Sequence, residues 1–356
     1  MELLTYNFQD NLQIQLPTID QNTNFWMIRT EQGLFYEEFL SGQFIALRWN
    51  EIDSNFLKSI KATKDDEKRA KEFIQERYTD IKRGGSVLSK CRKFVYEINE
   101  GDILMIPGKT DIAFGIAGEY YESDDTAENE DEFLLNREFY LDLDSYECPY
   151  KKRRTIELIK RVPHSKINPN LYKALISYHG INDLWDYRGF VLQAMYEVYY
   201  YENQLAITFE ITQEKGIDAI DFADFIGSTA ETIRTFCPGE VHSRMNLNSP
   251  GDLTFLVEIS EALVASANIL MPVLEEHLTS LCALWIMLKG GSIKKGDFEF
   301  QLNGLLERSK IKEEYHESIL QKLIQLAKNM TRGKKSLKIS DSTFENVINL
   351  DDHRDK

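Results

Sequence analysis

Short apolar runs in the first third of the chain constrain its fold more than any other feature. Residues 25–28 (Phe-Trp-Met-Ile) and 44–47 (Phe-Ile-Ala-Leu) flank a connector that has helical spacing. Residues 103–107 and 112–121 follow the same strand-like pattern, with a Pro107-Gly108-Lys109 turn between them. Runs of about four to eight apolar or alternating residues bounded by turn signals predict strands. We therefore expect the N-terminal half to form a small β-barrel whose mouth is lined by aromatic side chains.

The balance of charge limits the partners of the chain as a whole. The 356 residues carry a formal net charge of -16. Proteins that coat nucleic acid are usually basic, because phosphate contacts supply most of their affinity. The total charge therefore counts against a simple DNA-coating role, whereas it is compatible with a local basic groove.

Cysteine spacing and hydropathy are typical of a protein of the cytoplasm. The four cysteines are scattered and form no CxxC pair, which argues against a zinc site or a disulfide framework. An acid, Glu2, stands where the basic segment of a signal peptide is expected. The most apolar window, residues 278–288, is shorter than the about 20 residues that span a bilayer. We expect this window to form a buried or self-associating helix, and we expect no membrane partner.

The rest of the N-terminal half is predicted to complete the barrel. Residues 134–143 and 154–162 look like strands, and the acidic residues 123–132 are expected to form a solvated or mobile loop. A helix then follows Asn168-Pro169. The first domain is predicted to span residues 1–188.

The second half has a different pattern, typical of a mixed α+β and helix-rich domain over residues 189–330. Residues 204–211 and 241–247 read as strands, and residues 217–236 as an amphipathic helix. Ser249-Pro250-Gly251-Asp252 predicts the entry to a long helical region that reaches residue 288. Residues 331–356 are expected to form a loose tail. The predicted fold class is α+β.

Five elements of the N-terminal half occur in a characteristic order. They are residues 26–29 with Trp26, 33–39 with Tyr36, 47–51 with Trp49, 101–107 with Gly101-Asp102, and 114–121 with Tyr120. In this order they resemble the PUA/EVE-like module at the front of many modification-dependent restriction and phage-defence proteins. The resemblance covers roughly residues 23–165 and leaves the C-terminal half unassigned. Arg48 and the acidic run after Tyr121 depart from the family pattern.

The resemblance implies a pocket that receives an extruded and often modified base, or a nucleotide-like ligand. Such a base needs aromatic faces for stacking and polar groups that read its edge. The residues to which the resemblance assigns ligand binding are Trp26, Arg29, Tyr36, Trp49, Asn50 and Tyr120. Trp49-Asn50 is the strongest candidate, because the family's pocket lies at that position. The alternative for each aromatic side chain is a place in the barrel core.

A dense run of basic residues follows directly from a predicted barrel strand. The run consists of Lys151, Lys152, Arg153 and Arg154. Contact with phosphates beside the pocket is one interpretation. The other is a solvated strand end that offsets the acidic run at 123–132.

Catalytic motifs are not recognisable, so we assign no catalytic residue, metal site or cofactor and favour a non-enzymatic protein. A nuclease of the expected kind needs an Asp followed by Glu-x-Lys, which hold a metal and position water. Residues 210–215 contain glutamates and a lysine at the wrong spacing.

These inferences predict a prokaryotic anti-phage defence protein. Its N-terminal barrel would sense the base or nucleotide-like ligand. Its C-terminal domain would mediate assembly or signalling, by self-association or with a defence-system partner protein. Two alternatives stay open. One is a divergent nuclease effector, and the other is a protein-interaction module that has lost nucleic-acid binding and whose acidic surface meets a basic partner.

Overall fold

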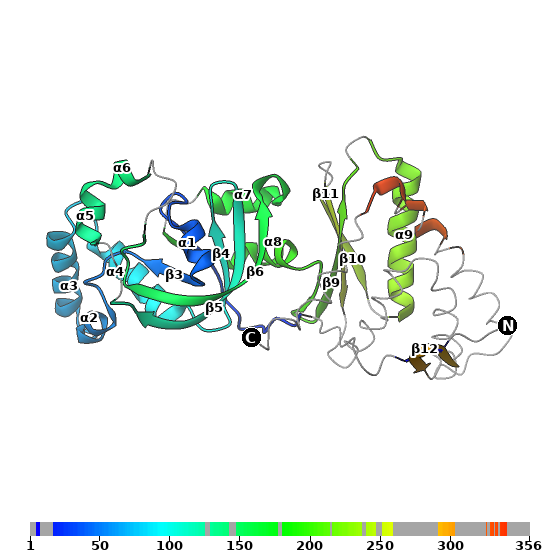
Figure 1. Cartoon of the computed structure of the whole chain (residues 1–356), viewed down its shortest axis with the longest axis horizontal. Helices are drawn as coiled ribbons and strands as arrows, with labels where there is room; N and C mark the ends of the chain where they lie inside the picture. The colour runs from blue at the N-terminus through cyan, green and yellow to red at the C-terminus, as the bar shows by residue number, and fades with distance from the viewer. Residues whose placement is uncertain are drawn as a thin grey trace. The chain divides into compact units, whose positions relative to one another are not determined.

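The chain has an α+β fold, as predicted, and divides into two compact units (Figure 1). Residues 22–195 form the N-terminal unit, and residues 1–21 with 196–356 form the C-terminal unit. We describe each unit by itself. The computed structural model describes residues 5–7, 17–124, 129–141, 147–176, 180–213, 216–236, 240–246, 251–258, 291–302, 325, 328–330, 332–333 and 335–339.

A curled six-stranded sheet organises the N-terminal unit (Figure 1). Its strand order is β3-β6-β5-β4-β2-β7. Strand β2 runs parallel to β4, and the other neighbours are antiparallel. The strands are β2 (Phe25–Ile28), β3 (Phe44–Leu47), β4 (Ile103–Pro107), β5 (Asp111–Glu122), β6 (Lys152–Pro163) and β7 (Ile181–Asp183). Among the described residues no pairing joins β3 to β7, so the sheet is open.

Helices surround this sheet and begin at residues that suit helix starts. Asp53 accepts a hydrogen bond from the Phe56 N–H, and Thr63 caps the next helix in the same way. The helices are α1 (Tyr36–Ser41), α2 (Ser54–Ser59), α3 (Lys64–Arg77), α4 (Gly84–Arg92), a π-helical turn (Lys93–Glu97), α5 (Glu130–Leu135), α6 (Arg137–Leu141), α7 (Pro169–Leu175) and α8 (Arg188–Met195), with 3₁₀ turns at His164–Lys166 and Trp185–Tyr187.

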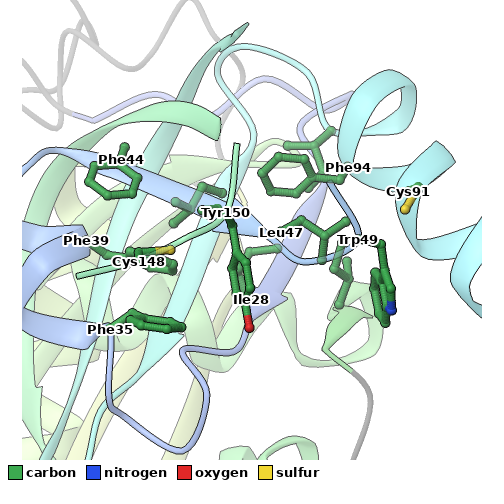
Figure 2. Packing of buried hydrophobic residues seen from close by; sticks show 14 of the residues in the cluster. Ile28, Phe35, Phe39, Phe44, Leu47, Trp49, Cys91, Phe94, Cys148 and Tyr150 are labelled. Carbon is green, nitrogen blue, oxygen red and sulfur yellow. The ribbon is translucent and has the colours of Figure 1, made fainter. Parts of the chain in front are cut away.

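Aromatic side chains fill the core of the N-terminal unit (Figure 2). Phe35 of the connector packs against Phe39 of α1 and against Tyr150, and Phe39 packs against Phe44 of β3. All four are buried. Aromatic pairs in this distance range add stabilisation beyond the area that they bury. The apolar runs that predicted the strands therefore also supply the core.

The prediction of a strand at 134–143 is wrong, because the described residues of this segment belong to α5, which ends at Leu135, and to α6 (Arg137–Leu141). Asn129 accepts the Asp131 N–H, and three acids fill the first turn of α5, where they suit the helix dipole. Phe133 lies in the core, with its ring centroid 5.4 Å from that of Phe35. The last residues of the acidic run thus begin a helix. Strand β6 pairs directly with β5.

The units divide at other places than the predicted domains. We predicted a boundary at residue 188, but the N-terminal unit extends to Met195, because α8 buries Val191, Leu192 and Met195. Residues 1–21 belong to the C-terminal unit. There the Tyr200 N–H donates to the Pro17 carbonyl at 2.9 Å.

The C-terminal unit contains a four-stranded antiparallel sheet in the order β10-β11-β9-β8. Its helix α9 (Ala219–Phe236) buries Phe225, whose ring centroid lies 5.6 Å from that of Phe209. A separate parallel pair joins β1 (Thr5–Asn7) to β12 (Gly291–Leu302). The strands of the larger sheet are β8 (Val198–Tyr201), β9 (Gln204–Ile211), β10 (Val241–Asn246) and β11 (Gly251–Glu258).

Two predictions for the C-terminal half need correction. A helix entry at 249–252 is wrong, since β11 begins at Gly251 and pairs with β9 on one side and β10 on the other. The loose tail is also wrong in part, because Leu337 and Ile339 are buried and Ile339 bridges to Ile211 of β9. The apolar window at 278–288 lies outside the described residues. No helix in the described ranges is long and apolar enough to cross a membrane.

The glycines after Phe114 are explained by the close approach of β6. A Cβ on Gly115 would lie 2.6 Å from the Glu157 carbonyl oxygen. Real Cβ atoms do not approach a backbone oxygen so closely, and the register of the β5–β6 pair shifts at this point. This part of the motif therefore serves the sheet.

Asp102 ties together the ends of β2 and β4. Its buried carboxylate accepts the Trp26 indole N–H at 2.9 Å, the Asn24 N–H at 3.0 Å and the Asn99 N–H at 2.9 Å. Hydrogen bonds to a charged acceptor are stronger than neutral ones. The Gly101-Asp102 motif is thus a structural anchor for Trp26.

We expect Asp102→Ala to lower the free energy of unfolding of the N-terminal unit by about 3 kcal/mol, because it leaves buried donors without an acceptor. Urea unfolding followed by tryptophan fluorescence measures this change. Asp186→Ala, at an exposed aspartate of the same unit, is the control and should cost less than about 0.5 kcal/mol. Equal effects of the two substitutions would show that Asp102 is no anchor.

Candidate functional site

A pocket of about 620 Å³ opens beside Asn50 in the N-terminal unit. Most of its wall is acidic, with six carboxylates from Glu51, Asp53, Glu122, Asp124, Glu130 and Asp131. Three cations also line it, Arg77, Lys151 and Lys152, together with Asn50 and Asn129. The pocket lies at the position that the sequence favoured, but its wall is made of carboxylates in place of aromatic rings.

The backbone at Trp49 has an unusual conformation that its neighbours stabilise. Trp49 has a φ of 71°, in the left-handed region that bulky residues avoid. The buried Glu130 carboxylate accepts the Trp49 N–H at 2.7 Å and the Asn50 N–H at 2.8 Å. The Trp49 carbonyl accepts the Ile52 N–H at 2.9 Å and also the ammonium of Lys152. Strain of this kind persists only where several contacts hold it.

The Trp49 ring belongs to the core rather than to the pocket wall. Only 6% of the residue is exposed, and Figure 2 shows it at the edge of the buried cluster, with its indole nitrogen directed away from Phe39. Lys90 lies 5.3 Å from the ring centroid and Arg48 5.7 Å, which is cation–π range. Burial lowers the pKa of Lys90. The buried indole nitrogen has no hydrogen-bond partner among the residues that the structure describes.

The other predicted aromatic faces are also in use within the fold. Trp26 is buried on Asp102, and Tyr36 is buried at the start of α1. Burial, followed by the charge of Asp111, raises the pKa of Tyr36. Tyr120 is half-buried, and its hydroxyl donates to Glu122 at 2.7 Å. Of these three side chains, that of Tyr120 contacts the pocket wall, through the hydrogen bond from its hydroxyl to Glu122.

Arg29 and Asn50, the polar residues predicted to contact the ligand, form hydrogen bonds to backbone groups of the protein itself. The Arg29 guanidinium donates to the Leu175 carbonyl. The Asn50 side chain donates to the Pro149 carbonyl at 2.8 Å and accepts the Lys151 N–H at 2.9 Å. Asn50 therefore lines the pocket while its amide fixes the chain that enters β6.

The four basic residues at 151–154 do not form one surface. Lys152 is 0% exposed, and burial lowers its pKa. Arg154 is buried and donates to the carbonyls of Phe94 and Val95 at the π-helical turn and to that of Gly118. Arg153 donates to the Tyr150 and Cys148 carbonyls. Only Lys151 is exposed, and its ammonium lies 3.7 Å from Asp124.

Sequence reasoning missed the acids of the wall. Asp53 was not singled out, and Glu130 stood within an acidic run that predicted a solvated loop. Glu122 accepts the Ser54 N–H at 2.9 Å. Burial raises the pKa of Glu122, but this N–H and the Tyr120 hydroxyl outweigh it and leave the pKa below its usual value. Acids spaced like these are ordinary surface residues until the fold brings backbone N–H groups to them.

Comparisons of the chain with protein-family models, with curated proteins and with solved structures give no match. In the described part of the chain, no group of three or more His, Cys, Asp or Glu side chains is arranged to hold a metal ion.

We expect Glu130→Ala to lower the free energy of unfolding of the N-terminal unit by about 3 kcal/mol, because two backbone N–H groups lose a charged acceptor. Thermal and urea unfolding measure the loss, and a red shift of tryptophan emission would report exposure of Trp49. The control is Glu132→Ala, at an exposed glutamate of the same helix. If both variants unfold alike, Glu130 does not hold the Trp49 backbone.

Proposed function

We propose that the N-terminal unit is a PUA/EVE-like sensor that binds a base or nucleotide-like ligand in the pocket beside Asn50, and that the protein acts in prokaryotic anti-phage defence. The position of the pocket carries this proposal. It is lined by Asn50, one of the two residues at which the family resemblance puts the ligand, in a unit built on a curled six-stranded sheet.

The wall of the pocket favours recognition of a ligand's edge over stacking. Trp26, Tyr36 and Trp49 are buried in the core, so their faces do not serve a guest. The carboxylates and Asn50 offer hydrogen-bond acceptors and charge instead. A base with exposed N–H donors meets these requirements.

The C-terminal unit is proposed to mediate assembly or signalling, through self-association or a defence-system partner protein. Its four-stranded sheet has α9 packed on it through Phe225 and Ile233, which gives this unit a core of its own. A unit with its own core can transmit or assemble without taking part in the pocket.

Binding of nucleosides to the full chain tests the sensor. Calorimetry with a panel of natural and modified deoxynucleosides should detect binding, and Asp53→Asn should weaken it about tenfold, since it removes one charge from the wall. Asparagine caps a helix as well as aspartate does, so α2 should be retained. Asp186→Asn is the matched control and should bind as the parent chain does. Absence of nucleoside binding would reject the sensor.

A second candidate, the protein-interaction module, is favoured by the same six carboxylates, because they also suit a basic segment of a partner. A lysine- and arginine-rich peptide added in the same calorimeter separates the two. Peptide binding that Asp53→Asn weakens, without any nucleoside binding, would replace the sensor with this candidate.

The defence role predicts a phenotype in cells. Expression of the chain with its genomic neighbours in a bacterial host should lower the plating efficiency of at least one phage of a broad panel. Asp53→Asn should restore plating, because a sensor without its ligand does not respond, and Asp186→Asn should protect as the parent chain does. Full protection by Asp53→Asn would separate the pocket from defence.

A further inference from the structure

Two acids of the pocket wall form no ion pair within the described residues, although the charge of Lys152 acts on both of them. Arg77 pairs with Glu51 and with Asp131, and Lys151 pairs with Asp124. Asp53 and Glu122 form no ion pair with any lysine or arginine that the structure describes. They are joined through α2, because Glu122 accepts the N–H of Ser54, the residue next to Asp53.

Backbone groups hold these two carboxylates in place. Asp53 accepts the Phe56 N–H at 2.6 Å, and Glu122 accepts the Ser54 N–H and the Tyr120 hydroxyl on one oxygen. A carboxylate has about four acceptor positions, so each retains capacity for further donors. Fixed acceptors bind a guest with little loss of side-chain entropy. The pair is therefore prepared for two neighbouring N–H donors.

Lys152 contributes a positive charge at the same pocket, which favours a hydrogen-bond acceptor on the guest. Lys152 is among the residues that line the pocket, and its side chain is fully buried. Within the described residues its ammonium has one hydrogen bond, to the Trp49 carbonyl, although an ammonium has three donors. No carboxylate among the described residues forms an ion pair with it. A buried cation of this kind favours partial negative charge nearby. The guest should therefore carry an acceptor oxygen beside its donors.

We infer that the pocket reads a lactam edge of the guanine type, in which a carbonyl oxygen lies beside a ring N–H and an amino group. The ring N–H and the amino group would donate to Asp53 and Glu122. The carbonyl oxygen would lie toward Lys152. This inference rests on the proposed function, because it names the base that the proposed sensor recognises.

Other ligand chemistries fit the same charges less well. An adenine edge has only one donor group beside an acceptor nitrogen. A guanidinium has the donors but brings a positive charge toward Lys152. A phosphate or a free carboxylate would enter a wall with six carboxylates and three cations.

Calorimetry on the full chain with guanosine, inosine, adenosine, cytidine and methylguanidinium tests the inference. Inosine has the carbonyl and the ring N–H but lacks the amino group. We expect guanosine to bind most tightly and inosine about tenfold more weakly, because one wall acceptor loses its donor. GMP should bind more weakly than guanosine.

Two conservative variants connect this preference to the wall. Asp53→Asn and Glu122→Gln keep the side-chain shape and an acceptor for the backbone N–H groups. Each should weaken guanosine binding about tenfold and reduce the difference between guanosine and inosine. Asp186→Asn, the matched control, should leave both unchanged.

The outcomes separate this inference from the proposed sensor. Binding of adenosine or cytidine as tight as that of guanosine overturns the guanine edge and leaves the sensor standing. Binding of methylguanidinium alone overturns the guanine edge and identifies a guanidinium as the guest. Failure of every nucleoside to bind overturns the sensor itself. Guanosine binding that both wall variants retain in full also overturns the inference, because the edge would then lie elsewhere.

Discussion

The Glu130 carboxylate supports the loop on which the candidate site depends. It joins the N-terminus of α5 to the end of β3 by accepting the N–H groups of Trp49 and Asn50. The ammonium of Lys152 donates a hydrogen bond to the carbonyl of Trp49 in the same segment. A left-handed tryptophan costs free energy, and the site tolerates it because opposite charges are bonded to both of its backbone groups. The loop is thereby held in the conformation that opens the pocket beside Asn50.

Charged side chains bonded to backbone groups also explain why the basic run at the start of β6 is largely buried. Arg154 takes carbonyls that the π-helical turn leaves without intrahelical donors, so its guanidinium closes a helix end. Lys152 offsets part of the negative charge that Asp53, Glu122 and Glu130 bring to the pocket. Buried cations with such partners are costly to withdraw. With Arg153, which donates to the Tyr150 and Cys148 carbonyls, three members of the run are part of the fold, which leaves Lys151 as its exposed cation.

Secondary structure was predicted correctly where a residue pattern is compatible with one kind of element. Apolar runs such as 25–28 and 44–47 became strands, because short buried runs bounded by polar residues fit a sheet. The strand prediction at 134–143 failed because Asn129, which caps the N-terminus of α5, lay within the acidic run and was not recognised as a helix start. The prediction of a helix entry at Ser249-Pro250 failed because β11 pairs with two neighbouring strands, and this pairing outweighed the local helix signal.

The site was harder to predict for a reason that lies in the acids themselves. Asn50 lines a pocket, whereas the aromatic residues predicted as stacking faces, Trp26, Tyr36 and Trp49, are buried in the core. Three acids of the wall, Asp53, Glu122 and Glu130, differ from the solvated acids of this chain by the backbone N–H groups that donate to them. Those groups come from a helix start at α2 and from the turn after β3, and neither contact is local in sequence for Glu122 or Glu130. Tertiary structure thus converts ordinary acidic residues into fixed hydrogen-bond acceptors, which no local sequence pattern announces.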